Sequence, residues 1–148
     1  MTWDGGSTSD SIMVIVLRIA GVSLLVLACL HGAFWRTFRW SEAMKCLSPL
    51  NARIFITHMV FVIFILVAQG MLLVLRPDLL LTGSDLARLL LYALIAFWLL
   101  RFVLQPLVFN PVLQEGWTGS VIVKIGSMLL WLAYAVMFGK ALLSQTAR

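Results

Sequence analysis

Two histidines are the residues whose type and position most directly suggest chemistry. His31 and His58 are the only histidines of the chain, and they lie at the facing ends of two apolar runs that a basic turn connects. Two neutral imidazoles on neighbouring antiparallel helices are the donor set that an axial pair for a b-type haem requires. An electron-transfer protein with haem iron between His31 and His58 is therefore one hypothesis. The alternative is that the two rings only bond to each other, to the backbone or to lipid headgroups.

A second polar group lies in the third apolar run. Trp98, Arg101 and Gln105 are separated by three and four residues, so they share one face of a helix. Arg101 would lie about 12 Å inside the end of that helix, at a rise of about 1.5 Å per residue. A charged side chain at this depth is expected to point into a helix bundle or a wet cleft.

Together these residues predict a polar ligand-binding site near one membrane face. Its candidate members are His31, His58, Arg101, Gln105, Asn51 and Trp98. The fourth apolar run would add Lys124, Ser127 and Trp131, which also share a helical face. Because arginine binds phosphate and carboxylate groups, the site suits an anionic group, such as a lipid headgroup, or a quinone-like ligand. The competing interpretation is a hydrogen-bonded network that only fixes helix register.

The composition of the chain requires a lipid environment. Its 148 residues, enough for one domain, are 62% hydrophobic and only 11% charged, with a mean hydropathy of +1.04. An ordinary soluble domain has about 25% charged residues. The net charge of +5 comes from residues at the ends of apolar runs. This distribution indicates membrane topology rather than nucleic-acid binding.

Four apolar runs predict an all-α membrane protein. The expected helices cover about residues 12–35, 54–75, 86–109 and 119–143. Each run supplies the roughly 20 residues that a bilayer span requires. Short connections favour an antiparallel four-helix bundle, with a single transmembrane domain over residues 11–148 after a polar tail over residues 1–10.

Smaller features are expected to organise the ends and contacts of these helices. A short amphipathic helix at the membrane interface, between the first two spans, is predicted by the spacing of Trp40, Ala43, Met44 and Leu47. Helix starts are predicted at Ser48-Pro49 and at Ser84-Asp85. Close helix contacts are expected at Gly21, Gly32, Gly70 and Gly126.

The basic residues predict the orientation in the membrane. The connection between the first two runs contains Arg36, Arg39, Lys45 and Arg53 against one acid, Glu42. The positive-inside rule places this connection in the cytoplasm and both termini in the periplasm of a bacterial inner membrane. Cys46 would then lie on the cytoplasmic side, where thiols stay reduced.

Several functional classes lack the residues that they require. No Asp or Glu lies inside a predicted span, which argues against a carboxylate-bridged metal pair and a proton-coupled transporter. Two histidines are too few for a histidine-box oxygenase, and the sequence has no G-x-S-x-G or P-loop motif. We therefore expect a non-enzymatic scaffold or accessory subunit of unknown cofactor. Its expected partners are the lipid bilayer and other membrane subunits or further copies. A small transporter or channel subunit is a further hypothesis.

The motifs also carry a resemblance. His31 to Trp35, Leu50-Asn51 leading to His58, and Trp98-x-x-Arg101-x-x-x-Gln105 resemble segments of small bacterial four-helix inner-membrane proteins of unassigned function. The segment LRIAGVSLLVLACLHGAF is similar to the first helix of DoxX-like four-helix proteins. These resemblances imply a bacterial inner membrane and a left-handed helix bundle, and they imply no activity.

Overall fold

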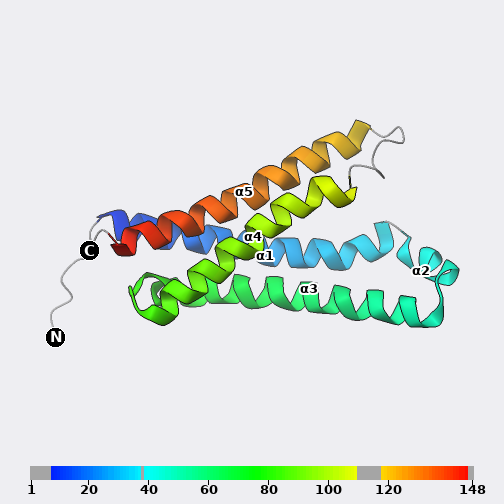
Figure 1. Cartoon of the computed structure of the whole chain (residues 1–148), viewed down its shortest axis with the longest axis horizontal. Coiled ribbons are helices and arrows are strands. Elements are labelled where there is room, and N and C mark those ends of the chain that lie inside the picture. Colours follow the sequence, from blue (N-terminus) through cyan, green and yellow to red (C-terminus); the bar gives the residue numbers. More distant parts are fainter. Residues whose placement is uncertain (1–7, 38, 110–117, 147–148) are drawn as a thin grey trace. The chain divides into compact units, whose positions relative to one another are not determined.

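The apolar runs of the sequence form helices, in which every backbone hydrogen bond stays within its own segment. The computed structural model describes residues 8–37, 39–109 and 118–146, and these ranges contain no strand (Figure 1). The four long helices are α1 (Thr8–Thr37), α3 (Pro49–Leu75), α4 (Asp85–Phe109) and α5 (Thr118–Thr146). The predicted all-α fold is therefore confirmed.

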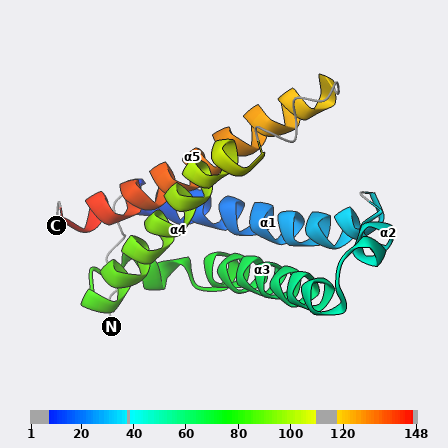
Figure 2. The ribbon, with the colours of Figure 1, turned by 45° about the vertical axis from the view of Figure 1, so that its right-hand side comes forward.

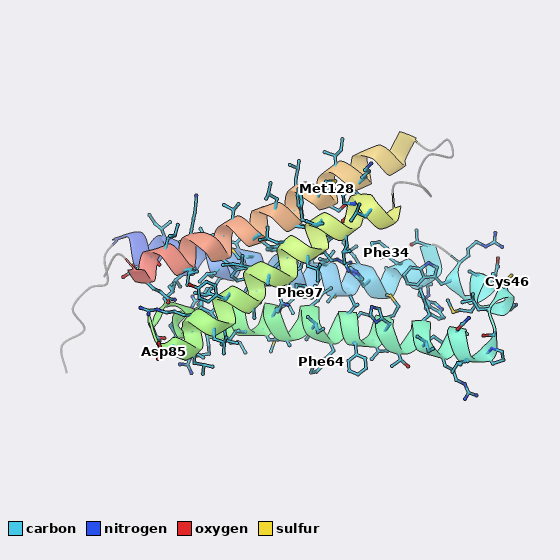
Figure 3. All side chains as sticks on the ribbon, viewed as in Figure 1. Phe34, Cys46, Phe64, Asp85, Phe97 and Met128 are labelled. Atoms are coloured by element: carbon cyan, nitrogen blue, oxygen red, sulfur yellow. The ribbon has the colours of Figure 1, made fainter. Side chains whose placement is uncertain are left out.

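All four long helices are long and apolar enough to cross a membrane. Their candidate spans contain 28, 27, 23 and 22 residues, in chain order, and a bilayer core requires about 20. Large apolar side chains are exposed along them, for example Ile19 at 65% and Phe64 at 66%. Phe64 points away from the ribbon in Figure 3. Such surfaces are stable against lipid, which is the architecture of a multi-pass membrane protein.

The first two spans begin earlier than the apolar runs suggested. Helix α1 begins at Thr8, so residues 8–10, which the composition assigned to the polar tail, are helical. The rest of that predicted tail, residues 1–7, lies outside the described residues. Helix α3 begins at Pro49, ahead of its apolar run, because Ser48 caps it: the side chain of Ser48 accepts a hydrogen bond from the backbone N–H of Asn51 at 3.3 Å.

Both predicted helix starts are confirmed. Pro49 lies in the first turn of α3, where its missing N–H has no intrahelical partner to lose. At α4, the hydroxyl of Ser84 accepts a hydrogen bond from the backbone N–H of Ala87 at 3.2 Å. Asp85 follows in the first turn, where a negative charge stabilises the positive end of the helix dipole.

The chain divides into two compact units, Met1–Pro77 and Asp78–Arg148. In the first unit, α1 and α3 lie side by side (Figures 1 and 2). They are joined by the short helix α2 (Trp40–Ala43) and a 3-10 turn, Met44–Cys46. A short helix therefore lies where one was predicted, and its position at a membrane interface stays a prediction. The single domain expected over both units also stays a prediction.

Close backbone contact joins α1 to α3. A Cβ atom at Gly21 would lie 2.8 Å from the Cβ of Leu73 and 2.9 Å from the carbonyl oxygen of Gly70. A Cβ atom at Gly70 would lie 2.8 Å from Leu25 Cγ. Because no larger residue fits at either position, the two glycines let the helices touch. The other two glycines expected at close contacts, Gly32 and Gly126, have no atom within 4 Å of such a Cβ.

In the second unit, α4 and α5 pack against each other as an antiparallel pair. Trp98 of α4 stacks on Trp131 of α5, with ring centroids 5.2 Å apart. Towards the other end of α5, the side-chain amide of Gln145 donates a hydrogen bond to the carbonyl oxygen of Leu80, in the 3-10 turn Pro77–Leu81 that precedes α4. These two contacts fix the direction and register of the pair.

Candidate functional site

An arginine and three aromatic rings meet between α4 and α5. The ring of Trp98 is buried, with its centroid 5.2 Å from that of Trp131 and 4.5 Å from that of Tyr134. The guanidinium carbon of Arg101 lies 5.4 Å from the centroid of the Trp131 ring. Cations within about 6 Å of an indole face are attracted by its quadrupole. Trp131 therefore holds the guanidinium group of Arg101 on one side.

Gln105 connects the two helices through both ends of its amide. Its Nε2 donates a hydrogen bond to the hydroxyl of Ser127, and its Oε1 accepts one from Nε1 of Trp131. Ser127 in turn donates to the backbone carbonyl of Lys124 at 2.9 Å. This network fixes the indole of Trp131 and, with it, the surface on which Arg101 lies.

Helical spacing explains why these residues meet. Side chains separated by three and four positions share one face of a helix. This spacing aligns Trp98, Arg101 and Gln105 on α4, and it aligns Ser127 and Trp131 on α5. We name these five residues the polar cluster. The structure thus brings together three of the six predicted site residues and two of the residues expected from the fourth run. Ligand binding by them stays a prediction.

The polar cluster contains positive charge without a matching acid. Arg101 is half-buried within the apolar span Asp85–Leu107. Lys124, half-buried and one turn before Ser127 on α5, adds a second cation. Among the described residues, neither cation has a carboxylate partner. Glu115 lies outside the described residues. Because an uncompensated charge in an apolar medium is costly, the cluster is suited to hold an anion.

The other three predicted site residues lie in the first unit, in different environments. His31 of α1 is 9% exposed, and its Nδ1 lies 2.8 Å from the carbonyl oxygen of Leu27 in the same helix. His58 of α3 is exposed. Asn51 is also exposed, in the first turn of α3, where its backbone rather than its side chain bonds to Ser48.

The two histidines do not fit a bis-imidazole haem site. Such a site requires both rings to face one enclosed gap between the helices. His31 is buried and bonded to its own helix, whereas His58 lies on an exposed face of α3. No contact of the described residues favours the electron-transfer hypothesis, and none favours the transporter or channel hypothesis.

Gln145 is a buried polar residue that the sequence pattern did not single out. It is 6% exposed, its Nε2 donates to the carbonyl oxygen of Leu80, and its Oε1 has no hydrogen-bond partner among the described residues. A signal for its burial exists in the sequence, because position 145 continues the helical spacing of Trp131, Phe138 and Ala141. Its location near the chain end made it resemble part of a polar tail.

Comparisons of the chain with protein-family models, with curated proteins and with solved structures found no match. The resemblance to DoxX-like and other small four-helix proteins therefore stays a prediction. The function is argued from the geometry and charge of the polar cluster alone.

Proposed function

We propose that this protein is a small, non-enzymatic scaffold or accessory subunit of the bacterial inner membrane that binds an anionic lipid headgroup at the polar cluster. Arg101 carries the proposal. Its guanidinium group lies inside an apolar span, fixed over the Trp131 ring, with no carboxylate partner among the described residues. A charge in this position requires a counter-ion, and the surrounding solvent offers one as lipid phosphate.

The chemistry of the cluster suits a phosphate group. A guanidinium presents several N–H donors in a plane and binds phosphate through two parallel hydrogen bonds. The amide of Gln105 is occupied by Ser127 and Trp131, so it positions the indole and leaves the anion to Arg101. Lys124 supplies a second positive charge at the same end of the hairpin.

Depth in the membrane agrees with this role. Arg101 lies about 12 Å from the end of α4, and an arginine side chain extends towards the headgroups by snorkelling. In the proposed orientation, with both termini in the periplasm, this end of α4 faces the cytoplasm. The cytoplasmic leaflet is the one that carries anionic lipid. The proposal includes association of the two helical pairs as an antiparallel four-helix bundle, with α2 at the interface.

The test is the stability of the purified protein in mixed micelles. A ligand that binds only the native state raises its stability by mass action. Phosphatidylglycerol is therefore expected to shift the midpoint of SDS-induced unfolding upwards by more than the same amount of phosphatidylcholine. Arg101→Leu is expected to abolish that difference. An undiminished response to phosphatidylglycerol in Arg101→Leu would show that the proposal is wrong.

Two variants separate a bound lipid from nonspecific charge attraction and from a counter-ion within the chain. Arg88→Leu removes an equal charge from the exposed first turn of α4, and its response to phosphatidylglycerol is expected to remain. Glu115→Gln removes the acid nearest to the cluster in the sequence. If Glu115 were the counter-ion of Arg101, its loss would open the site and strengthen the lipid response. A headgroup that is already the counter-ion predicts no change.

A further inference from the structure

The connector between α1 and α3, residues 36–53, combines the densest positive charge of the chain with exposure. It contains four basic residues against one acid, Glu42. All four basic side chains are exposed: Arg36, Arg39, Lys45 and Arg53. None of them belongs to the polar cluster, which lies in the other unit.

Most of this charge is unpaired within the described residues. The ion pair of the connector joins Arg39 Nη2 to Glu42 Oε1 at 2.8 Å, and both side chains are exposed. Arg36, Lys45 and Arg53 have no acidic partner among the described residues. The connector therefore presents three uncompensated cations on a short segment.

Aromatic contacts hold the connector against both helix ends. The ring of Trp40 in α2 meets Trp35 of α1 edge-on, with centroids 6.3 Å apart. On its other side, Trp40 meets Phe55 of α3 edge-on, with centroids 5.2 Å apart. Edge-to-face pairs of this kind are favourable arrangements of aromatic rings. The cations thus project from a fixed platform.

Two further features suit this platform to a membrane surface. Arg39 adopts a left-handed backbone conformation, with φ of 50°, where glycine is the usual residue. The chain keeps a basic side chain there, and that side chain is 75% exposed. Leu47 and Leu50, at 41% and 67% exposed, lie beside these charges in the sequence. Exposed leucines with basic residues and tryptophans are typical of segments that lie at a bilayer interface.

We propose that the connector is a binding surface for anionic phospholipids, which it gathers around the first helical pair. The cations attract lipid phosphates, and Leu47 and Leu50 enter the acyl boundary beside them. An acidic soluble protein would use the same cations and would leave both leucines in water. The surface is separate from the headgroup site at Arg101, so either one can fail alone.

Cys46 allows lipid enrichment to be measured at the connector itself. It is exposed, and it lies at the connector end of the first unit (Figure 3). In the Cys29→Ser variant, Cys46 is the sole thiol for a fluorophore. The labelled full chain is placed in vesicles of phosphatidylcholine and phosphatidylglycerol at equal amounts, with quenching bromine atoms on the acyl chains of one lipid at a time.

At low salt, brominated phosphatidylglycerol is expected to quench the fluorophore about twofold more than brominated phosphatidylcholine, because each basic residue near the surface attracts anionic lipid. High salt is expected to remove the difference by screening. Equal quenching by the two lipids at low salt would overturn the proposal. An acidic soluble partner, rather than lipid, would then be the occupant to test.

Charge-matched variants assign the effect to the connector. Combined Arg36→Gln, Lys45→Gln and Arg53→Gln substitutions are expected to equalise the quenching. Combined Arg18→Gln, Arg88→Gln and Lys140→Gln substitutions remove three exposed cations elsewhere and should keep the preference. If the connector variant does not fold, Lys45→Gln alone is expected to reduce the preference in part. A preference unchanged by loss of the connector cations would refute the assignment. Arg101→Leu is expected to leave it unchanged.

Discussion

Gln105 is the residue on which the arrangement of the polar cluster depends most. Its amide bonds to Ser127 and to Trp131, and the ring of Trp131 in turn supports Arg101. A leucine in its place would fill similar space without either hydrogen bond. Loss of Gln105 should therefore disturb both the α4–α5 contact and the position of the guanidinium group.

A double-mutant cycle with Gln105→Leu and Ser127→Ala tests the contact between these residues. Interhelical hydrogen bonds in membranes contribute about 0.6 kcal/mol each. Gln105→Leu is thus expected to lower the free energy of unfolding by about 1 kcal/mol, and the two substitutions together by less than their sum. SDS-induced unfolding of the purified protein measures this.

Ser144→Ala is the matched control for that cycle. The Ser144 hydroxyl donates to the carbonyl oxygen of Ala141 in its own helix, at 2.8 Å, so its removal should not couple to Gln105. Strict additivity of Gln105→Leu and Ser127→Ala would mean that the side chains do not interact.

At the residue scale, spacing predicted one half of the proposed site and not the other. Trp98, Arg101 and Gln105 share a face by helical periodicity alone, and the depth of Arg101 indicated that it faces a helix. His31 and His58 share no such pattern, because each is a single polar residue in an apolar run. Without a pattern, the rotation of each ring about its helix is undetermined.

Among the elements, the α1–α3 pair depends on two glycines. An alanine at Gly21 or Gly70 would place a Cβ atom within 3.0 Å of neighbouring atoms, including backbone oxygen. Overpacking of this kind costs about 1–3 kcal/mol. We expect Gly21→Ala and Gly70→Ala each to lower the free energy of unfolding by that amount, as measured by SDS titration.

Gly32→Ala provides the comparison for the glycine variants. No atom lies within 4 Å of a Cβ at this position of α1, and alanine favours a helix over glycine by about 1 kcal/mol. Gly32→Ala should therefore be neutral or stabilising. If all three alanine variants behave alike, close contact at Gly21 and Gly70 is not what holds the pair together.

The start of α3 depends on the Ser48 cap. Ser48→Ala removes the acceptor for the Asn51 backbone N–H and is expected to destabilise the protein by about 1 kcal/mol. Thermal unfolding followed by circular dichroism measures the loss. Ser41→Ala, at an exposed position in α2, should cause no comparable change, and equal effects of the two variants would argue against a specific cap.

Element scale is where sequence patterns predicted most and where their limit is clearest. Hydropathy identified the four spans, and Ser48 and Ser84 identified two helix starts. The partner-facing side of α3 was not predictable. Its lipid-facing and helix-facing positions are almost equally apolar, so no hydrophobic stripe marks the contact face. Gly70 was the one available signal there, and an identical signal at Gly32 marks no contact.

For the whole molecule, the positive-inside rule predicts a cytoplasmic connector and periplasmic termini. In the Cys29→Ser variant, a membrane-impermeant maleimide should label Cys46 only after spheroplasts are permeabilised. Cysteine introduced at Ser144, in the last turns of α5, should show the opposite behaviour. Labelling of Cys46 in intact spheroplasts would reverse the proposed topology.

The assembly of the two helical pairs is the part of the fold that the sequence leaves open. Short connections predicted which helices pair, because neighbouring helices in the chain pack most readily. The same apolar surfaces that contact lipid would also contact a second pair, a further copy or another subunit. Composition does not distinguish among these partners, so the four-helix bundle rests on topology and stays a proposal.

Native mass spectrometry of the protein released from membranes is the measurement that decides whether Arg101 holds a headgroup. It should compare the wild type with Arg101→Leu and Arg88→Leu. We predict that the wild type and Arg88→Leu retain a phosphatidylglycerol or another anionic phospholipid through gentle removal of detergent, and that Arg101→Leu loses it. Equal retention of anionic lipid by Arg101→Leu, or no retained lipid on the wild type, would contradict the proposed function.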